Sequence, residues 1–155
     1  MADRPEVAVG AVVIDDRDRV LLVKRGNPPR AGRWAIPGGR VRLGETLQAA
    51  AEREIREETG LTVKARAPVY AFELIEPAVG GGYDFHYVVV DVVADYVGGT
   101  LQPADDALDA RWFDLADAAV AGEVDDITRR FLAAWERAGR PMVPGWVTPE
   151  RGADP

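Results

Sequence analysis

The sequence predicts an α/β fold in which helices flank a mixed sheet within one domain. Valine-rich apolar runs of strand length, beginning with VAVGAVVI at residues 7–14, indicate buried strands. Residues 46–59 and 125–138 instead space their apolar side chains as helices do. The order strands, helix, strands, helix then favours helices packed on a common sheet.

The first part of the chain predicts a hairpin, a loop and a helix. The turn signal DDRD joins the first strand to a second one, VLLVKR at residues 20–25. After a proline-stiffened loop, residues 34–36 predict a short strand that ends in a turn at Pro37-Gly38-Gly39. Thr46 is a suitable N-cap for the helix, and Gly60 is a suitable C′ residue to end it.

The second part predicts two long strands, a short strand and a second helix. The first long strand, residues 62–75, is interrupted near Pro68. The later elements are a loop at 76–82, a strand at 83–97, a turn at Gly98-Gly99, an acidic loop at 101–109, a strand at 110–113 and the helix, with Ile127, Phe131, Leu132 and Trp135 inward. We expect one domain over residues 1–155, with a core at about 6–138 and a tail at 139–155.

Composition excludes several kinds of site and partner. The chain of 155 residues has a net charge of −7, which disfavours nucleic-acid partners because phosphates would be repelled. With no cysteine and a single histidine, thiolate chemistry and a multi-histidine zinc site are excluded. The N-terminus has no signal-peptide pattern, and no apolar run has the ~20 residues that cross a membrane. We therefore expect a cytoplasmic protein without a membrane partner.

Three glutamates of the first predicted helix form the clearest functional signal. Glu54, Glu57 and Glu58 stand at i, i+3 and i+4, so a helix places them on one face. This face overlaps the packed side of the helix, where repulsion between carboxylates is screened less. A hard divalent cation such as Mg²⁺ or Mn²⁺ would explain the cluster, because these ions prefer oxygen ligands.

The plain alternative is a solvated acidic face held by ordinary helical ion pairs. Arg53 and Arg56 are interleaved with the glutamates and could pair with them. The flanks argue for a metal site, because carbonyl groups at Gly38 and Gly39 could add oxygen ligands. Glu45 adds a further acid just before the helix.

This segment resembles the Nudix box of the MutT-like hydrolases, G-x5-E-x7-R-E-U-x-E-E-x-G-U, where U is aliphatic. Nine specified positions are matched over 23 residues: Gly39, Glu45, Arg53, Glu54, Ile55, Glu57, Glu58, Gly60 and Leu61. VAVGAVVI, VLLVKR, GRWAIPGG and DARWFDL resemble the flanking strands of the family. The resemblance covers about residues 6–138 and implies an α/β/α sandwich around a mixed sheet.

The resemblance implies roles for the box residues. Glu57 and Glu58 would be the main metal ligands, Glu54 a further ligand or the general base, and the Gly38 carbonyl another ligand. The ion would be Mg²⁺, with Mn²⁺ as a substitute. Arg53 would pair with a box glutamate and hold its rotamer. Three positions would serve the motif itself: Glu45 would support a metal or brace the loop, Gly39 would permit the tight turn, and Gly60 would end the helix.

Residues outside the box give weaker predictions. In some family members the general base is a distal acid; the candidates are Asp105, Asp106 and Asp109, with Asp106 preferred and turn chemistry as the alternative. Arg25 would bind phosphate, unless it forms a surface ion pair. Trp34, Tyr70, Phe72 and Tyr83 are candidates for stacking on a base, and Phe72 is preferred, although strand aromatics belong more often to a core.

The substrate is suggested by one proline. Pro77 lies sixteen residues after Leu61, where the ADP-ribose pyrophosphatase subgroup carries a proline. We therefore expect hydrolysis of ADP-ribose, or of a related nucleotide sugar, at its diphosphate linkage. The alternatives are a nucleoside triphosphate pyrophosphohydrolase and a non-catalytic nucleotide-binding module. The tail has apolar residues that could serve a homodimer interface or could equally pack on their own domain: Met142, Val143, Trp146 and Val147.

Overall fold

The structure, a computed structural model of the chain, describes residues 2–28 and 30–146. Its strands are β1 (Glu6–Ile14), β2 (Arg19–Arg25), β3 (Trp34–Ala35), β4 (Gly38–Arg40), β5 (Leu61–Pro77), β6 (Tyr83–Gly99) and β7 (Ala107–Asp114). Its helices are α1 (Leu47–Thr59), α2 (Leu115–Ala118) and α3 (Asp126–Arg137). The predicted order of strands, helix, strands and helix is confirmed, with β4 and α2 as additional short elements.

The strands form one mixed sheet. Its main path runs β3-β2-β1-β6-β5, while β4 pairs with β1 and β7 pairs with β2. The β1–β6 pairing is parallel and the other pairings are antiparallel. Because a parallel partner needs a crossover, β6 reaches β1 only after α1 and β5 have been laid down.

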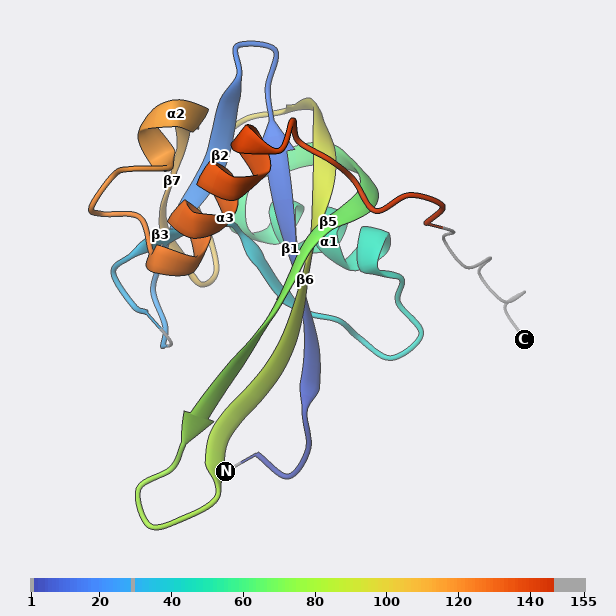
Figure 1. Cartoon of the computed structure of the whole chain (residues 1–155). Helices are drawn as coiled ribbons and strands as arrows, with labels where there is room; N and C mark the ends of the chain where they lie inside the picture. The colour runs from blue at the N-terminus through green and yellow to red at the C-terminus, as the bar shows by residue number, and fades with distance from the viewer. Residues whose placement is uncertain (1, 29, 147–155) are drawn as a thin grey trace.

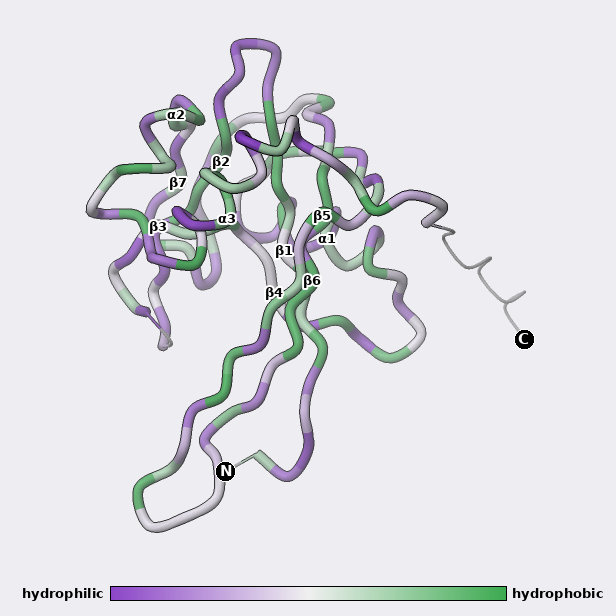
Figure 2. The backbone as a smooth tube through the Cα atoms, in the orientation of Figure 1, coloured by the Kyte–Doolittle hydropathy of each residue, from purple (hydrophilic) through white to green (hydrophobic). Residues whose placement is uncertain are grey.

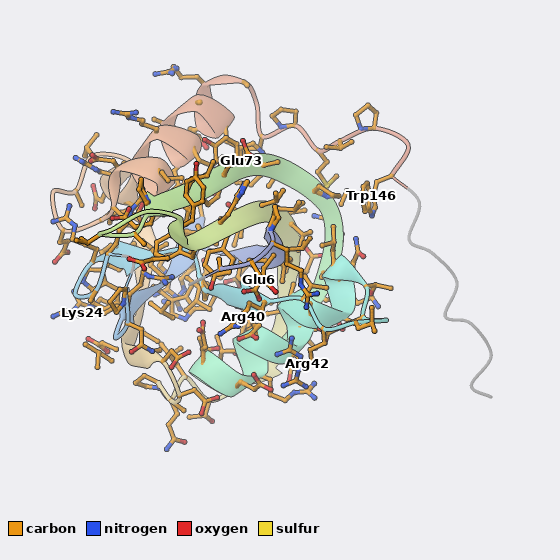
Figure 3. All side chains as sticks on the ribbon, turned by 90° about the horizontal axis from the view of Figure 1, so that it is seen from below. Glu6, Lys24, Arg40, Arg42, Glu73 and Trp146 are labelled. Atoms are coloured by element: carbon orange, nitrogen blue, oxygen red, sulfur yellow. The ribbon has the colours of Figure 1, made fainter. Side chains whose placement is uncertain are left out.

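Helices cover both faces of this sheet, which confirms the α/β/α sandwich (Figure 1). The side chains of β1 alternate: Val9, Ala11 and Val13 join the core under α1, whereas Val12 joins the core under α3. Seen at 90°, α1 and α3 lie on opposite sides of the strands (Figure 3). A strand with a continuous apolar run, such as residues 7–14 of β1, is expected where both faces are covered.

Strands β5 and β6 continue beyond the body as a long two-stranded ribbon (Figure 1). The register shifts on either side of Pro68, which has no N–H to donate, so the predicted interruption is confirmed. Figure 2 shows hydrophilic and hydrophobic residues alternating along the ribbon. The N-terminal segment returns to its end, where the Ala2 backbone N donates to the Tyr83 carbonyl over 2.8 Å.

Several boundaries differ from the sequence prediction. Gly38 and Gly39 belong to β4 and pair with β1, so the predicted turn there is wrong. Gly98 and Gly99 extend β6 and pair with Thr62 and Leu61 at the start of β5, so the predicted turn there is also wrong. Strand β7 begins at Ala107 within the predicted acidic loop, and the four-residue helix α2 was not predicted.

The described part of the tail packs on its own chain. The Val143 backbone N donates to the Pro68 carbonyl over 2.9 Å, and Trp135 Nε1 donates to the Pro141 carbonyl over 3.0 Å. Met142, Val143 and Trp146 remain partly exposed, while Val147 lies outside the described residues. In the described part of the chain, every helix is too short or too polar to cross a membrane.

Candidate active site

Helix α1 carries the three glutamates, and its ends are fixed as predicted. Thr46 Oγ1 accepts from the Ala49 backbone N over 3.0 Å, and Gly60 ends the helix with φ of 73°. Glu58 continues the buried stripe of Ala51 and Ile55, because the three residues stand at i, i+4 and i+7. The acidic cluster therefore begins in the core and ends at the surface of the domain.

The three glutamates differ in exposure. Glu58 is 7% exposed, whereas the side chains of Glu54 and Glu57 are 14% and 37% exposed. The expectation that the acids follow the packed side of the helix holds fully for Glu58 and in part for Glu54.

Arg53 holds the other acids in place. Its Nε and Nη2 donate to the two carboxylate oxygens of Glu45 over 2.7 and 2.9 Å. Its Nη1 donates to Glu54 over 2.6 Å and to Glu57 over 3.2 Å. Nη2 also donates to the Arg40 carbonyl over 3.0 Å. One guanidinium thus connects α1 to β4 and to the loop at Glu45, and it holds the pKa of Glu45 below its usual range.

Gly39 is required by close packing and not by a turn. A Cβ at this position would lie 2.4 Å from the Glu54 carboxyl carbon and 2.5 to 2.6 Å from its two oxygens. At Gly38, a Cβ would lie 2.0 Å from the Val9 carbonyl oxygen. Neither glycine has a positive φ. The predicted role of Gly39 as a turn residue is therefore wrong, and β4 approaches α1 and β1 more closely than any side chain permits.

Glu58 is buried at a high electrostatic cost. Burial, together with repulsion from Glu54 and Asp106, raises its pKa to about 8. Two contacts offset only part of this rise in pKa. The Gly38 backbone N donates to Glu58 Oε2 over 3.3 Å, and the positive charge of Arg25 acts in the same direction. A buried carboxylate of this kind is stabilised by any further positive charge placed beside it.

These residues suit a hard cation, but they are not gathered around one point. Within residues 2–28 and 30–146, no three acidic or histidine side chains already surround a position that could hold a metal ion. Glu54 and Glu57 are turned toward Arg53 instead. A cation at Glu58 would draw these two carboxylates away from the guanidinium, and the oxygen-only donor set fits Mg²⁺ or Mn²⁺.

A cleft of about 580 Å³ connects the glutamates to the N-terminal end of α3. At the α1 end it is lined by the three glutamates and by basic side chains: Arg25, Arg40, Arg42 and Arg53. In Figure 3 the labelled Arg40 and Arg42 lie on the α1 side of the strands. The cleft therefore has an end with charges of both signs, which suits a cation together with phosphate groups.

Most of the predicted site residues outside the box line this cleft. Gly38, Arg25, Phe72 and Asp106 all do so. Asp106 accepts from Asn27 Nδ2 over 2.8 Å and lies close enough to Glu58 to raise its pKa.

Other candidates lie elsewhere. Pro77 is exposed at the end of β5, opposite Tyr83 and outside the cleft, because the ribbon carries both away from the body. Trp34 is buried in the core, and Tyr70 stacks on Phe131 at a centroid distance of 4.7 Å. Asp105 adopts a positive φ of 51° in the turn before β7. Asp109, within β7, accepts from the Ala110 backbone N over 2.8 Å.

The sequence analysis missed several polar residues of the cleft, including four at its α3 end. Asp91 interrupts a run of valines in β6 and is buried, and Asp125 caps α3 beside Arg30 and Thr128. The one available signal was the carboxylate within VVVDVV, since an acid in a strand that is apolar on both faces must point into the protein.

The fold and the cleft together define the class of protein: an α/β/α domain whose first helix brings three glutamates, one of them buried, to the end of a cleft that also presents basic groups. The NUDIX domain family matches residues 4–135. The chain therefore belongs to the Nudix family and carries the domain of a Nudix hydrolase.

Named relatives agree with this membership. The chain is 39% identical over 111 residues to an ADP-ribose pyrophosphatase of Methanocaldococcus jannaschii, covering 72% of this chain and 63% of the relative. It is 30% identical to the 8-oxo-dGDP phosphatase NUDT18 of Danio rerio, covering 68% of this chain and 31% of that protein. The chain thus spans less than two thirds of each relative.

Solved structures confirm the fold. A MutT Nudix hydrolase of Burkholderia pseudomallei superposes with a TM-score of 0.70 at 30% identity, covering 84% of this chain and 98% of that chain. A Nudix hydrolase of Nitrosomonas europaea gives 0.74 at 21% identity over 97% of this chain and 100% of that chain.

Proposed function

We propose that this domain hydrolyses the diphosphate linkage of a nucleoside diphosphate derivative, with ADP-ribose or a related nucleotide sugar as the substrate. The observation that carries the proposal is Glu58, a carboxyl buried at the edge of the cleft of about 580 Å³ with a pKa raised to about 8. Such a group is costly to keep unless a cation and its anionic substrate offset the cost. The products would be AMP and ribose 5-phosphate.

Mg²⁺, or Mn²⁺ in its place, fits the oxygen donors at the α1 end of the cleft. Glu57 and Glu58 would be its main ligands, with Glu54 and the Gly38 carbonyl as further ligands. When bound, the cation supplies positive charge beside the diphosphate and lowers the pKa of bound water. Arg53 would keep its bonds to Glu45 and to the Arg40 carbonyl, and so would hold α1 to β4 and to the loop at Glu45 while the other carboxylates turn to the site.

The chain itself would position the reacting groups. Arg25 binds phosphate oxygens, since it lines the same end of the cleft as Glu58. Asp106, held by Asn27, accepts a proton from the attacking water, with Glu54 as the other candidate base. The water oxygen bonds to a phosphorus atom of the diphosphate, and the bond from that phosphorus to the bridging oxygen breaks.

The substrate class is supported by the size of the cleft and by the archaeal relative. A cleft of about 580 Å³ is within the range that holds a nucleotide. The relative from Methanocaldococcus jannaschii is named an ADP-ribose pyrophosphatase. Pro77 does not support this substrate class, because it does not line the cleft of the single chain.

A substrate panel tests the proposal. The purified chain would be incubated with Mg²⁺ and ADP-ribose, NADH, UDP-glucose, a dinucleoside tetraphosphate or 8-oxo-dGTP, and the products separated by chromatography. We expect ADP-ribose to be cleaved fastest and Glu57→Gln to remove most of the activity. Preference for a triphosphate would keep the chemistry and overturn the substrate. No turnover with Mg²⁺ or Mn²⁺ would indicate a nucleotide-binding module instead.

A further inference from the structure

Asp91 is a buried carboxyl with no assigned task. It lies in β6 on the α3 face of the sheet, is 4% exposed and lines the cleft. In the described part of the chain, no hydrogen bond or ion pair reaches its carboxyl group. Its Oδ1 lies over Gly10 of β1, where a Cβ would come within 2.1 Å of it. The glycine therefore makes the space that the carboxyl occupies.

The neighbouring acid, Asp125, is fully engaged. Its Oδ1 accepts from Arg30 Nη1 and from the Thr128 backbone N, each over 3.0 Å. Its Oδ2 accepts from Thr128 Oγ1 over 3.0 Å. Burial and the negative charge of Asp125 together raise the pKa of Asp91 to about 7. Asp91 therefore has a populated neutral form near neutral pH, with one O–H to donate and one carbonyl oxygen to accept.

The surroundings of Asp91 exclude two kinds of ligand. An anion would be repelled by Asp125 and by the ionised form of Asp91. A cation would find one free carboxyl only, since the oxygens of Asp125 are already bonded to Arg30 and Thr128. The other walls are apolar, with Phe72 and Phe131 among them. This end of the cleft suits an uncharged flat ring that has a polar edge.

The distance between Asp91 and the α1 end of the cleft also fits a nucleotide. Asp91 pairs with Gly10, and Gly10 pairs with Gly38, whose backbone N binds Glu58. Two strand spacings put Asp91 about 10 Å from Gly38 along the sheet. A nucleoside 5′-phosphate can place its phosphorus near Gly38 and the edge of its base near Asp91.

We propose that Asp91 determines nucleobase specificity by pairing with the edge of adenine, donating to a ring nitrogen and accepting from the N6 amino group. This inference rests on the proposed function for the identity of the base. Asp125 acts as a positioning residue, because its bonds to Arg30 and Thr128 fix the start of α3 beside Asp91. A buried group that must pair with both a donor and an acceptor rejects a base that lacks one of them.

Binding of AMP and two analogues to the full chain tests this inference without requiring turnover. Purine riboside 5′-phosphate lacks the N6 amino group, and ribose 5-phosphate lacks the base. We expect the wild type to bind AMP about 10-fold more tightly than purine riboside 5′-phosphate, the value of one hydrogen bond of ~1.4 kcal/mol. Asp91→Asn, whose amide also offers a donor and an acceptor, should keep this ratio. Asp91→Val should reduce it to about one.

The controls separate recognition from folding. Asp84→Asn, in the same strand but exposed and outside the cleft, should leave the ratio unchanged. Circular dichroism and the melting temperature would verify that each variant folds. An equal loss of affinity for all three ligands in Asp91→Val, an unchanged ratio, or no binding of AMP at millimolar concentration would overturn the inference. Binding of AMP that depends on Asp91, without hydrolysis of ADP-ribose, would overturn the proposed function and keep the inference.

Discussion

At the residue scale, Gly39 and Glu54 occupy adjoining space, so the close approach of β4 to α1 depends on a missing side chain. A Cβ at Gly39 would come within 2.4 Å of the Glu54 carboxyl carbon. Arg53 bonds to the same carboxylate, and so the position of Glu54 is fixed from two sides. Changes at either neighbour should therefore act on catalysis through Glu54.

Gly39→Ala should lower the activity more than the stability. The added Cβ displaces the Glu54 carboxylate, and we expect kcat to fall at least about 10-fold, because a misplacement of about 1 Å can cost 100-fold. Gly98→Ala is the matched control, since a Cβ there meets nothing within 4 Å. Steady-state kinetics with ADP-ribose would measure the effect. An unchanged kcat in Gly39→Ala would show that catalysis does not depend on the position of the Glu54 carboxylate.

Arg53→Lys should reduce kcat about 10- to 100-fold, the usual effect of losing a partner that orients metal ligands. An ammonium keeps the charge but cannot form the paired bonds to Glu45 while also holding Glu54 and Glu57. Arg56→Lys, exposed on the same helix, serves as the control. Equal rates for Arg53→Lys and the wild type would contradict the orienting role.

Asp91 should make the protein less stable as the pH rises. Its pKa is about 7 in the folded state against 3.8 for the free side chain, so folding favours the protonated form. The contribution of Asp91 to the free energy of unfolding is greatest below about pH 4, falls between about pH 4 and pH 7, and stays low above pH 7. Each pKa unit corresponds to about 1.4 kcal/mol. Measured by urea unfolding, the free energy of unfolding should fall less between pH 5 and pH 8 in Asp91→Asn than in the wild type. An equal loss in both would contradict this assignment.

At the scale of elements, α1 is the part of the fold that local sequence determines most completely. Its cap residues and its apolar spacing act within the helix itself, so both ends could be predicted from the sequence. Strand β4 could not be predicted, because Gly38 and Gly39 are glycines for the sake of contacts with β1 and α1, which are distant in sequence. The task of Asp91 was missed for the same reason, since Asp125 and Gly10 meet it only in the folded chain.

Thr46→Ala should destabilise the domain by about 1 kcal/mol. The hydroxyl of Thr46 accepts from the Ala49 backbone N over 3.0 Å, and alanine leaves that donor without a partner inside the protein. Thr46→Ser keeps the acceptor and should retain most of the stability. Chemical denaturation of the three proteins would measure the difference. Equal losses in the two variants would mean that the methyl group, and not the cap, is what matters.

At the scale of the whole molecule, the two helical layers meet the cleft at opposite ends. Helix α1 brings the glutamates from one face of the sheet, and α3 brings Asp125 and Phe131 from the other. The parallel pairing of β1 and β6 places Asp91 beside Gly10, at the α3 end of the cleft. The sequence alone indicated the acidic end, because its box is continuous in the chain. The other end is assembled from separate segments.

Glu58 and its neighbours are proposed to hold the divalent cation with which the domain hydrolyses a diphosphate. The most direct measurement is the rate of ADP-ribose hydrolysis, with Mg²⁺ and with chelator, by the wild type, Glu58→Gln and Glu52→Gln. Glu52 lies on the same helix, and its glutamine can still accept from the Ala65 backbone N. We predict Mg²⁺-dependent release of AMP by the wild type and by Glu52→Gln. In Glu58→Gln the rate should fall at least about 100-fold, which is more than the loss of a residue that only orients metal ligands causes. Equal rates in Glu58→Gln and the wild type, or undiminished hydrolysis in chelator, would contradict the claim.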